Sequence, residues 1–183
     1  LGEIQNKGVE LLVGLVPVQT RDFTWSINWN FSKNNSEVLS LPEELGGEAI
    51  LYGIGDISLA AVVGMPVGVF KSEVPERDPS GNIVVNASNG LPIAAEKFEY
   101  VGDINYDYEM GISNNFSYKG INLGFDIDIR QGGKMYSRTK DINYFVGNAI
   151  QTTYNDRNPF IVPNSVVKNS DGSYSPNSTA VSV

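Results

Sequence analysis

The chain has 183 residues, carries 13 Lys and Arg against 21 Asp and Glu, and contains no Cys and no His. Without these two residue types it has no thiol nucleophile, disulfide, His-based triad or Cys/His zinc site. Its net charge of −8 and its scattered charges argue against a nucleic-acid partner. The sequence begins at Leu1, and we expect it to be a piece of a longer protein without the signal peptide.

Apolar and polar residues alternate with a period of two in four segments, which indicates strands with unlike faces. We expect these strands near residues 8–17, 23–32, 108–118 and 121–130. The second is the clearest, because one of its faces is apolar and largely aromatic, formed by Phe23, Trp25, Ile27, Trp29 and Phe31. The third has a single polar residue, Asn114, on its apolar face. The sequence therefore predicts an all-β chain.

Short and long connections alternate between the predicted strands. Lys119-Gly120 has the composition of a two-residue hairpin turn, and residues 18–22 form another short link. The segments 33–107 and 131–183 are rich in Gly, Pro, Asn and Ser, and we expect long loops there, with about one helical turn near residues 40–46. If neighbouring strands alternate in direction, both short links lie at one rim of the sheet and both long segments at the other.

No segment predicts a transmembrane helix. The longest uncharged run, residues 57–70, has 14 residues and is interrupted by Gly64, Pro66 and Gly68. We therefore do not expect a helical membrane protein.

Strands with one apolar face have two physical explanations. In a soluble sandwich the apolar face packs on a second sheet, whereas in an outer-membrane barrel it contacts lipid and the polar face lines the lumen. Predicted strands of 9 to 11 residues favour the barrel, as do the aromatic residues near strand ends and the asymmetry of the loops. Periodicity alone does not separate the two explanations.

Three patterns suggest chemistry, and each has a simpler interpretation. Residues 103–107 begin like a calcium loop, but Tyr108 and Asn114 occupy the positions that require Gly and Glu. Residues 53–55 suggest a dinucleotide-binding turn, without the third Gly or the strand-to-helix context. Asp126 and Asp128, with Arg130 next to them, could form an acid/base pair but fit a hydrated wall better. We predict no enzyme activity, no cofactor and no metal site.

Short motifs occur in series along almost the whole chain, at residues 4–11 (IQNKGVEL), 22–25 (DFTW), 30–34 (NFSKN), 64–68 (GMPVG), 78–82 (DPSGN), 100–103 (YVGD), 111–114 (GISN), 118–120 (YKG), 130–133 (RQGG) and 162–166 (VPNSV). In this order the chain resembles the barrel of SusC/RagA-type TonB-dependent outer-membrane transporters. One departure is at residues 105–107 (NYD), where the family commonly has a Pro ahead of the acidic residue.

The resemblance implies that residues 1–183 are about four strands from the later part of a large antiparallel transmembrane β-barrel, without its plug domain and termini. It implies an importer of glycans or peptides in the outer membrane of a Gram-negative bacterium. The expected partners are a SusD-like surface lipoprotein, TonB acting through the missing plug, an oligosaccharide or peptide substrate, and outer-membrane lipid. The long segments would then be extracellular loops.

On this interpretation the two faces of the strands have separate roles. The lumen-facing candidates are polar: Glu10, Asn28, Asn30, Asp126, Asp128 and Arg130. The lipid-facing candidates are apolar: Phe23, Trp25, Ile27, Trp29, Phe31, Ile112, Phe125 and Ile127. The alternative is a soluble, sandwich-like binding module, with carbohydrate as a possible ligand, in which the apolar residues would meet in a shared core.

Overall fold

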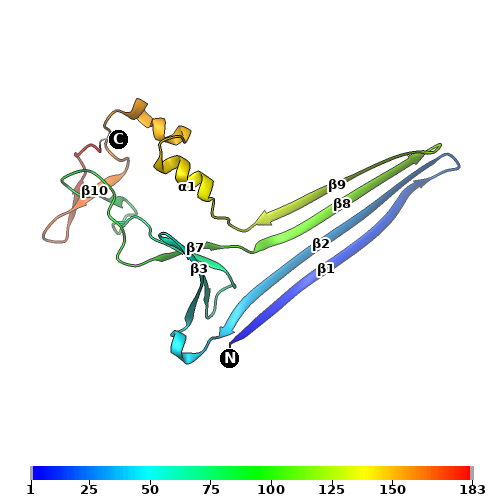
Figure 1. Ribbon diagram of the computed structural model, residues 1–183, viewed down its shortest axis with the longest axis horizontal. Coiled ribbons are helices and arrows are strands. Elements are labelled where there is room, and N and C mark those ends of the chain that lie inside the picture. Colours follow the sequence, from blue (N-terminus) through cyan, green and yellow to red (C-terminus); the bar gives the residue numbers. More distant parts are fainter. Residues whose placement is uncertain (1, 182–183) are drawn as a thin grey trace. The chain divides into compact units, whose positions relative to one another are not determined.

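The computed structural model describes residues 2–181 and is mostly β-strand, so the predicted fold class is confirmed (Figure 1). Four strands form an antiparallel sheet of order β1-β2-β8-β9, which we call the long sheet. They are β1 (Glu3–Gln19), β2 (Phe23–Ser40), β8 (Tyr106–Tyr118) and β9 (Ile121–Gly132). In Figure 1 the four lie side by side as the longest arrows.

Smaller elements fill the long segments. A sheet of order β3-β4-β5-β7 contains β3 (Glu48–Ile54), β4 (Ile57–Val62), β5 (Val69–Ser72) and β7 (Glu99–Asp103). A sheet of order β11-β10-β6 contains β6 (Ile83–Val84), β10 (Ser165–Lys168) and β11 (Tyr174–Pro176). The helical elements are η1 (Glu43–Leu45), α1 (Arg138–Phe145) and η2 (Ile150–Arg157). The long segments between residues 33–107 and 131–181 therefore contain small sheets and short helices as well as irregular connections.

The strands β1 and β2 are also longer than their alternation predicts. They have 17 and 18 residues, because polar residues beyond the alternating run continue the pairing. Asn34 pairs with Gly8, Ser36 with Asn6 and Val38 with Ile4, so backbone hydrogen bonds extend the hairpin where no apolar face marks it. Apolar periodicity reports a buried or lipid-facing side, and therefore it misses strand extensions that are polar on both faces.

The two short connections lie at the same rim of the long sheet, as predicted. Lys119 and Gly120 have φ values of 46° and 87°, the left-handed conformations that a two-residue hairpin turn requires. The backbone N–H of Lys119 donates to the carbonyl oxygen of Asp22 at 3.0 Å, so the turn contacts the link between β1 and β2.

The chain divides into two compact units. Unit 1 contains the residues up to Phe70 and Val101–Lys134, and unit 2 contains Lys71–Tyr100 and the residues from Met135. In unit 1 the buried apolar side chains are Val38, Ala60, Ala61 and Val69, and in unit 2 they are Val84, Val85 and Val181. Among residues 2–181, none of the helices has the length and apolar character needed to cross a membrane.

Candidate functional site

Strand register brings the apolar residues of the long sheet onto one side, which we call the apolar face. Leu15, Ile27, Asn114 and Phe125 lie in one cross-strand row, and Val13, Trp29, Ile112 and Ile127 lie in the next. All eight lipid-facing candidates belong to this face: Phe23, Trp25, Ile27, Trp29, Phe31, Ile112, Phe125 and Ile127. Because successive side chains alternate, a slip of one residue in any pairing would mix the two faces.

Aromatic side chains connect three strands across the apolar face. Phe116 on β8 stacks with Trp25 on β2 at a centroid distance of 5.6 Å and with Phe125 on β9 at 6.1 Å. Phe31 stacks in turn with Tyr108 at 5.8 Å, nearer the opposite end of the strands. Such cross-strand aromatic pairs stabilise a sheet and hold its register.

The polar exception on the apolar face has a bonding partner. Asn114 lies directly opposite Ile27 and is only 9% exposed, and its Oδ1 accepts a hydrogen bond of 3.3 Å from the indole Nε1 of Trp25. An indole N–H usually needs a polar partner, which draws Trp toward the interface of a membrane. Here the protein supplies that partner within the apolar face, so both polar groups are satisfied among apolar neighbours.

No second sheet covers the apolar face among the described residues. Leu15, Leu123 and Phe125 remain 54%, 61% and 45% exposed. A soluble sandwich would bury these side chains between two sheets. An exposed apolar surface that extends over four strands indicates contact with another apolar phase or partner.

The opposite side of the long sheet, which we call the polar face, holds all six lumen-facing candidates. Asn30 and Asp128 lie in one cross-strand row, and Asn28 and Asp126 lie in the next. Glu10, Ser32, Glu109 and Arg130 form a third row that crosses the whole sheet. Leu12 also falls on this face and is 78% exposed, so the polar character is weakest along β1.

The guanidinium of Arg130 pairs with a carboxylate that sequence spacing does not identify. Its Nε lies 3.1 Å from Oε1 of Glu109 on the neighbouring strand, and its Cζ lies 5.8 Å from the ring centre of Tyr106. Cross-strand partners lie closer to each other than residues two apart on one strand, and the register between β8 and β9 brings Glu109 within reach of Arg130. Asp126 and Asp128 are exposed, as a hydrated wall requires.

Glycines lie opposite asparagines at four places on the polar face. The cross-strand pairs are Gly8–Asn34, Gly14–Asn28, Gly111–Asn30 and Gly124–Asn115. A Cβ added to Gly111 would lie 2.9 Å from the amide of Asn30, so this side chain bends over the glycine backbone. In all four pairs the asparagine side chain lies within 3.4 Å of the position that a glycine Cβ would take.

The residues that depart from the family motif make local contacts in unit 1. The side-chain amide of Asn105 donates to the carbonyl oxygen of Val67 and to Oδ1 of Asp103, each at 2.9 Å. The backbone N–H of Asn105 donates to the same Oδ1, again at 2.9 Å. Asp103 therefore organises a turn at the start of β8, which fits the solvated approach to a strand that the sequence favours over a calcium loop.

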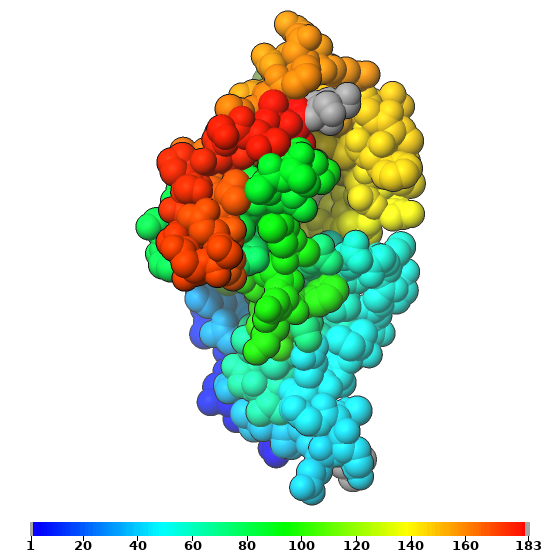
Figure 2. Space-filling model, turned by 90° about the vertical axis from the view of Figure 1, so that its left-hand side faces the viewer, coloured from blue at the N-terminus to red at the C-terminus, as the bar shows by residue number. Residues whose placement is uncertain are grey.

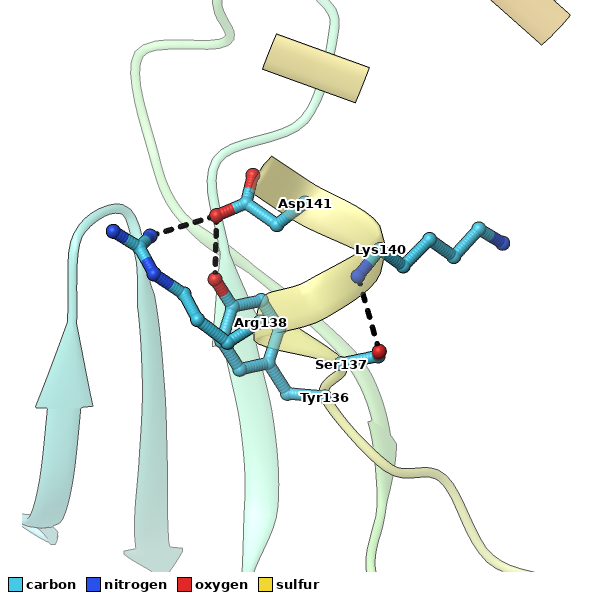
Figure 3. Close-up of polar contacts among 5 residues, drawn as sticks. All are labelled: Tyr136, Ser137, Arg138, Lys140 and Asp141. Atoms are coloured by element: carbon cyan, nitrogen blue, oxygen red, sulfur yellow. Dashed lines mark hydrogen bonds and ion pairs between the residues drawn. The ribbon is translucent and has the colours of Figure 1, made fainter. Parts of the chain in front are cut away.

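Polar contacts in unit 2 fix the first turn of α1 (Figure 3). Oδ2 of Asp141 accepts hydrogen bonds from the hydroxyl of Tyr136 at 2.8 Å and from Arg138 at 2.7 Å. Ser137 caps the helix, because its Oγ accepts from the backbone N–H of Lys140 at 3.2 Å. Tyr136 is half-buried and the other side chains are solvent-exposed, and their arrangement is that of a helix start.

Comparison with known proteins agrees with this geometry. No protein-family model matches the chain. TonB-dependent receptor P3 of Formosa agariphila is 25% identical over 161 residues, covering 76% of this chain and 16% of the relative. TonB-dependent receptor P39 of the same organism is 26% identical over 202 residues, covering 86% and 20%. TonB-dependent receptor SusC of Bacteroides thetaiotaomicron is 25% identical over 142 residues, covering 69% and 14%.

The chain is similar to TonB-dependent receptors. The resemblance found in its motifs is thereby confirmed, and the chain spans 20% or less of the length of these three relatives. TonB-dependent receptors are outer-membrane proteins of Gram-negative bacteria, so the expected location is confirmed as well.

Proposed function

We propose that the full-length protein is a TonB-dependent importer and that the long sheet is part of the wall of its barrel. One observation carries this proposal: register across four strands collects apolar side chains on one face and polar side chains on the other. Lipid would contact the apolar face, with Phe23, Trp25, Ile27, Trp29 and Phe31 at its centre, and water would contact the polar face.

The dimensions of the apolar face support this role. The run from Phe23 to Phe31 is about 27 Å long at the usual rise per residue, and a strand tilt of about 40° reduces it to a depth of about 20 Å. That depth is close to the apolar band of about 25 Å that outer-membrane barrels present to lipid. Ile27 lies halfway along the run and would therefore lie near the bilayer midplane.

The polar face would line an aqueous conduit through Glu10, Asn28, Asn30, Asp126, Asp128 and Arg130. The chemistry of such a wall is hydrogen bonding and weak charge attraction, because its side chains are exposed and well hydrated. We propose transport and no catalytic role. The substrate would be an oligosaccharide or a peptide.

The partners of the full-length protein follow from the same proposal. TonB would act through a plug region, and a SusD-like lipoprotein would cover the barrel from outside, as the resemblance implies. The long segments leave the rim opposite the tight turns, and in this arrangement that rim faces the cell exterior. Similarity to SusC and to other TonB-dependent receptors supports these roles.

Neighbouring residues on opposite faces provide the test. Ile27→Arg would place a cation in lipid near the midplane and should reduce the free energy of unfolding by about 2–4 kcal/mol. Asn28→Arg adds the same side chain one residue away on the polar face and should change it by less than about 1 kcal/mol. The measurement is denaturant unfolding of the full-length protein in lipid vesicles. Equal effects of the two substitutions would contradict the assignment of the faces.

A further inference from the structure

Unit 2 is built from two segments that are distant in sequence. Its strands β6 and β10 pair in parallel, with Ile83 opposite Ser165 and Val84 opposite Val166. Oγ1 of Thr179 donates to the carbonyl oxygen of Ala87 at 2.9 Å. Figure 2 shows the red carboxy-terminal residues lying against green residues of the same unit. The two segments therefore share one core and hold fixed positions within the unit.

Unit 2 contains an open groove with a volume of about 1030 Å³. Residues 74–77 and 95–100 line it, together with Lys168 from the other segment. Nζ of Lys168 lies 3.2 Å from Oε1 of Glu76, and this ion pair links the two segments at the groove. The hydrogen bond with Glu76 also raises the pKa of Lys168 above its ordinary value. The volume is at the upper end of the range of about 300–1,000 Å³ for small-molecule sites, so the open groove has room for a short peptide.

Charged side chains of both signs and aromatic rings line this groove, which we call the mixed-charge groove. The charged residues are Glu76, Glu96 and Glu99 on the acidic side and Arg77, Lys97 and Lys168 on the basic side. Phe98 and Tyr100 add rings that are 46% and 42% exposed. No Asn, Gln, Ser or Thr is among the described lining residues, although the chain as a whole is rich in Asn and Ser.

We propose that the mixed-charge groove binds an extended peptide that carries charged groups of both signs. The proposal rests on the proposed function and deepens it, because it selects peptide over oligosaccharide as the substrate class. A neutral sugar has no charged groups to pair with the six charged side chains that line the groove. Lysine, arginine and glutamate match the ammonium and carboxylate groups of a peptide, and exposed rings match its apolar side chains.

Binding of a labelled peptide to the purified full-length protein tests the proposal. The probe is the pentapeptide Ala-Lys-Phe-Glu-Ala with a fluorescent label, followed by anisotropy, with maltopentaose as the competing sugar. We expect the unlabelled peptide to displace the probe, maltopentaose to leave it bound, and added salt to weaken binding. Displacement by maltopentaose, or the absence of peptide binding, would overturn the proposal.

Substitution of two phenylalanines in unit 2 locates the site. Phe98→Ala should weaken peptide binding by about tenfold, the loss expected for one aromatic contact. Phe145→Ala is the matched control, because Phe145 lies on α1 outside the groove and is 90% exposed, and it should leave binding unchanged. Equal affinities of the two variants would overturn the assignment of the groove.

A charge reversal keeps the test decisive if Phe98→Ala fails to fold. Lys97 is exposed, so Lys97→Glu should fold, weaken binding of Ala-Glu-Phe-Glu-Ala and strengthen binding of Ala-Lys-Phe-Lys-Ala. Unchanged affinities for both peptides would refute the groove. Failure of the proposed function has a different signature, because Ile27→Arg and Asn28→Arg would then destabilise the protein equally whatever the peptide result.

Discussion

The hydrogen bond between Trp25 and Asn114 gives the sharpest test of the apolar face. Trp25→Phe removes the indole N–H and keeps a ring against Phe116, whereas Asn114→Leu removes the acceptor. Each single substitution removes the hydrogen bond and also changes the free energy of transferring the side chain into lipid. Its effect on the free energy of unfolding is therefore the sum of two contributions. A double-mutant cycle cancels those terms and isolates the interaction between the two residues.

The expected coupling follows from the geometry. A hydrogen bond between side chains in a membrane contributes about 0.6 kcal/mol on average and rarely more than about 1.7 kcal/mol. The Nε1 to Oδ1 distance of 3.3 Å is slightly beyond the usual range for an N–H donor, which places this bond near the average. We therefore expect a coupling of about 0.5–1 kcal/mol in favour of the native pair.

Trp29 supplies the control for this cycle. Trp25 and Trp29 are each two residues from Ile27, which lies opposite Asn114, so both tryptophans are diagonal neighbours of the asparagine. Only the Trp25 indole bonds to Asn114 among the contacts the structure describes. The cycle of Trp29→Phe with Asn114→Leu should give a coupling within about 0.3 kcal/mol of zero. The assay is denaturant unfolding of the full-length protein in lipid vesicles. Equal couplings for the two tryptophans would refute the reasoning.

Three further predictions concern the glycines, the shared core of unit 2 and an acidic turn. A Cβ on Gly8 would meet the backbone carbonyl oxygen of Lys33, so Gly8→Ala should reduce the free energy of unfolding by about 1–3 kcal/mol. The nearest atoms to a Cβ on Gly111 belong to the movable amide of Asn30, so Gly111→Ala should reduce the free energy of unfolding by less than Gly8→Ala does. A larger loss for Gly111→Ala in an unfolding assay would contradict this reasoning. Val84 is fully buried between both segments of unit 2, so Val84→Ala should reduce the free energy of unfolding by about 1–3 kcal/mol. Opening of the paired segments should then let trypsin cleave after Arg77 and after Lys168 together. Cleavage in one segment alone would show that they open separately. The pKa of Asp78 lies below its ordinary value of 3.8, first because of the hydrogen bond from the Asn82 side chain. The ionised carboxylate of Asp78 therefore stabilises the folded turn above pH 3.8, and this contribution is lost as the pH falls through the lowered pKa of Asp78. As the pH falls below 3.8, hydrogen exchange of the backbone amides of Ser80 and Asn82 should accelerate relative to an Asp78→Asn variant. Identical pH profiles of exchange in the two proteins would contradict the role of the Asp78 carboxylate.

Local sequence patterns predict much of the long sheet because they act over neighbouring residues. Alternation from Phe23 to Phe31 indicates which side chains share a face, since successive residues on a strand point to opposite sides. Lys119-Gly120 predicts a tight turn because glycine readily adopts a positive φ. For the same reason, the polar candidates within each strand share a face.

Contacts between distant residues are beyond such patterns. Trp25 and Asn114 are 89 residues apart, so nothing local indicates that the polar exception on β8 has a partner on β2. Arg130 likewise pairs with Glu109 through the β8-β9 register and not with the carboxylates of its own strand. The two long segments meet through β6 and β10, whose few residues carry almost no periodicity.

The sequence by itself determined that the chain is mostly β, which side chains alternate along each strand, and which family it resembles, because these properties depend on residue order over short distances. The tertiary structure decided how the four long strands align and how two remote segments form unit 2. Register is the alignment of residues on paired strands, and it determines whether the apolar faces of separate strands form one continuous surface. That surface exists in this protein because every pairing keeps the aromatic and aliphatic side chains in step.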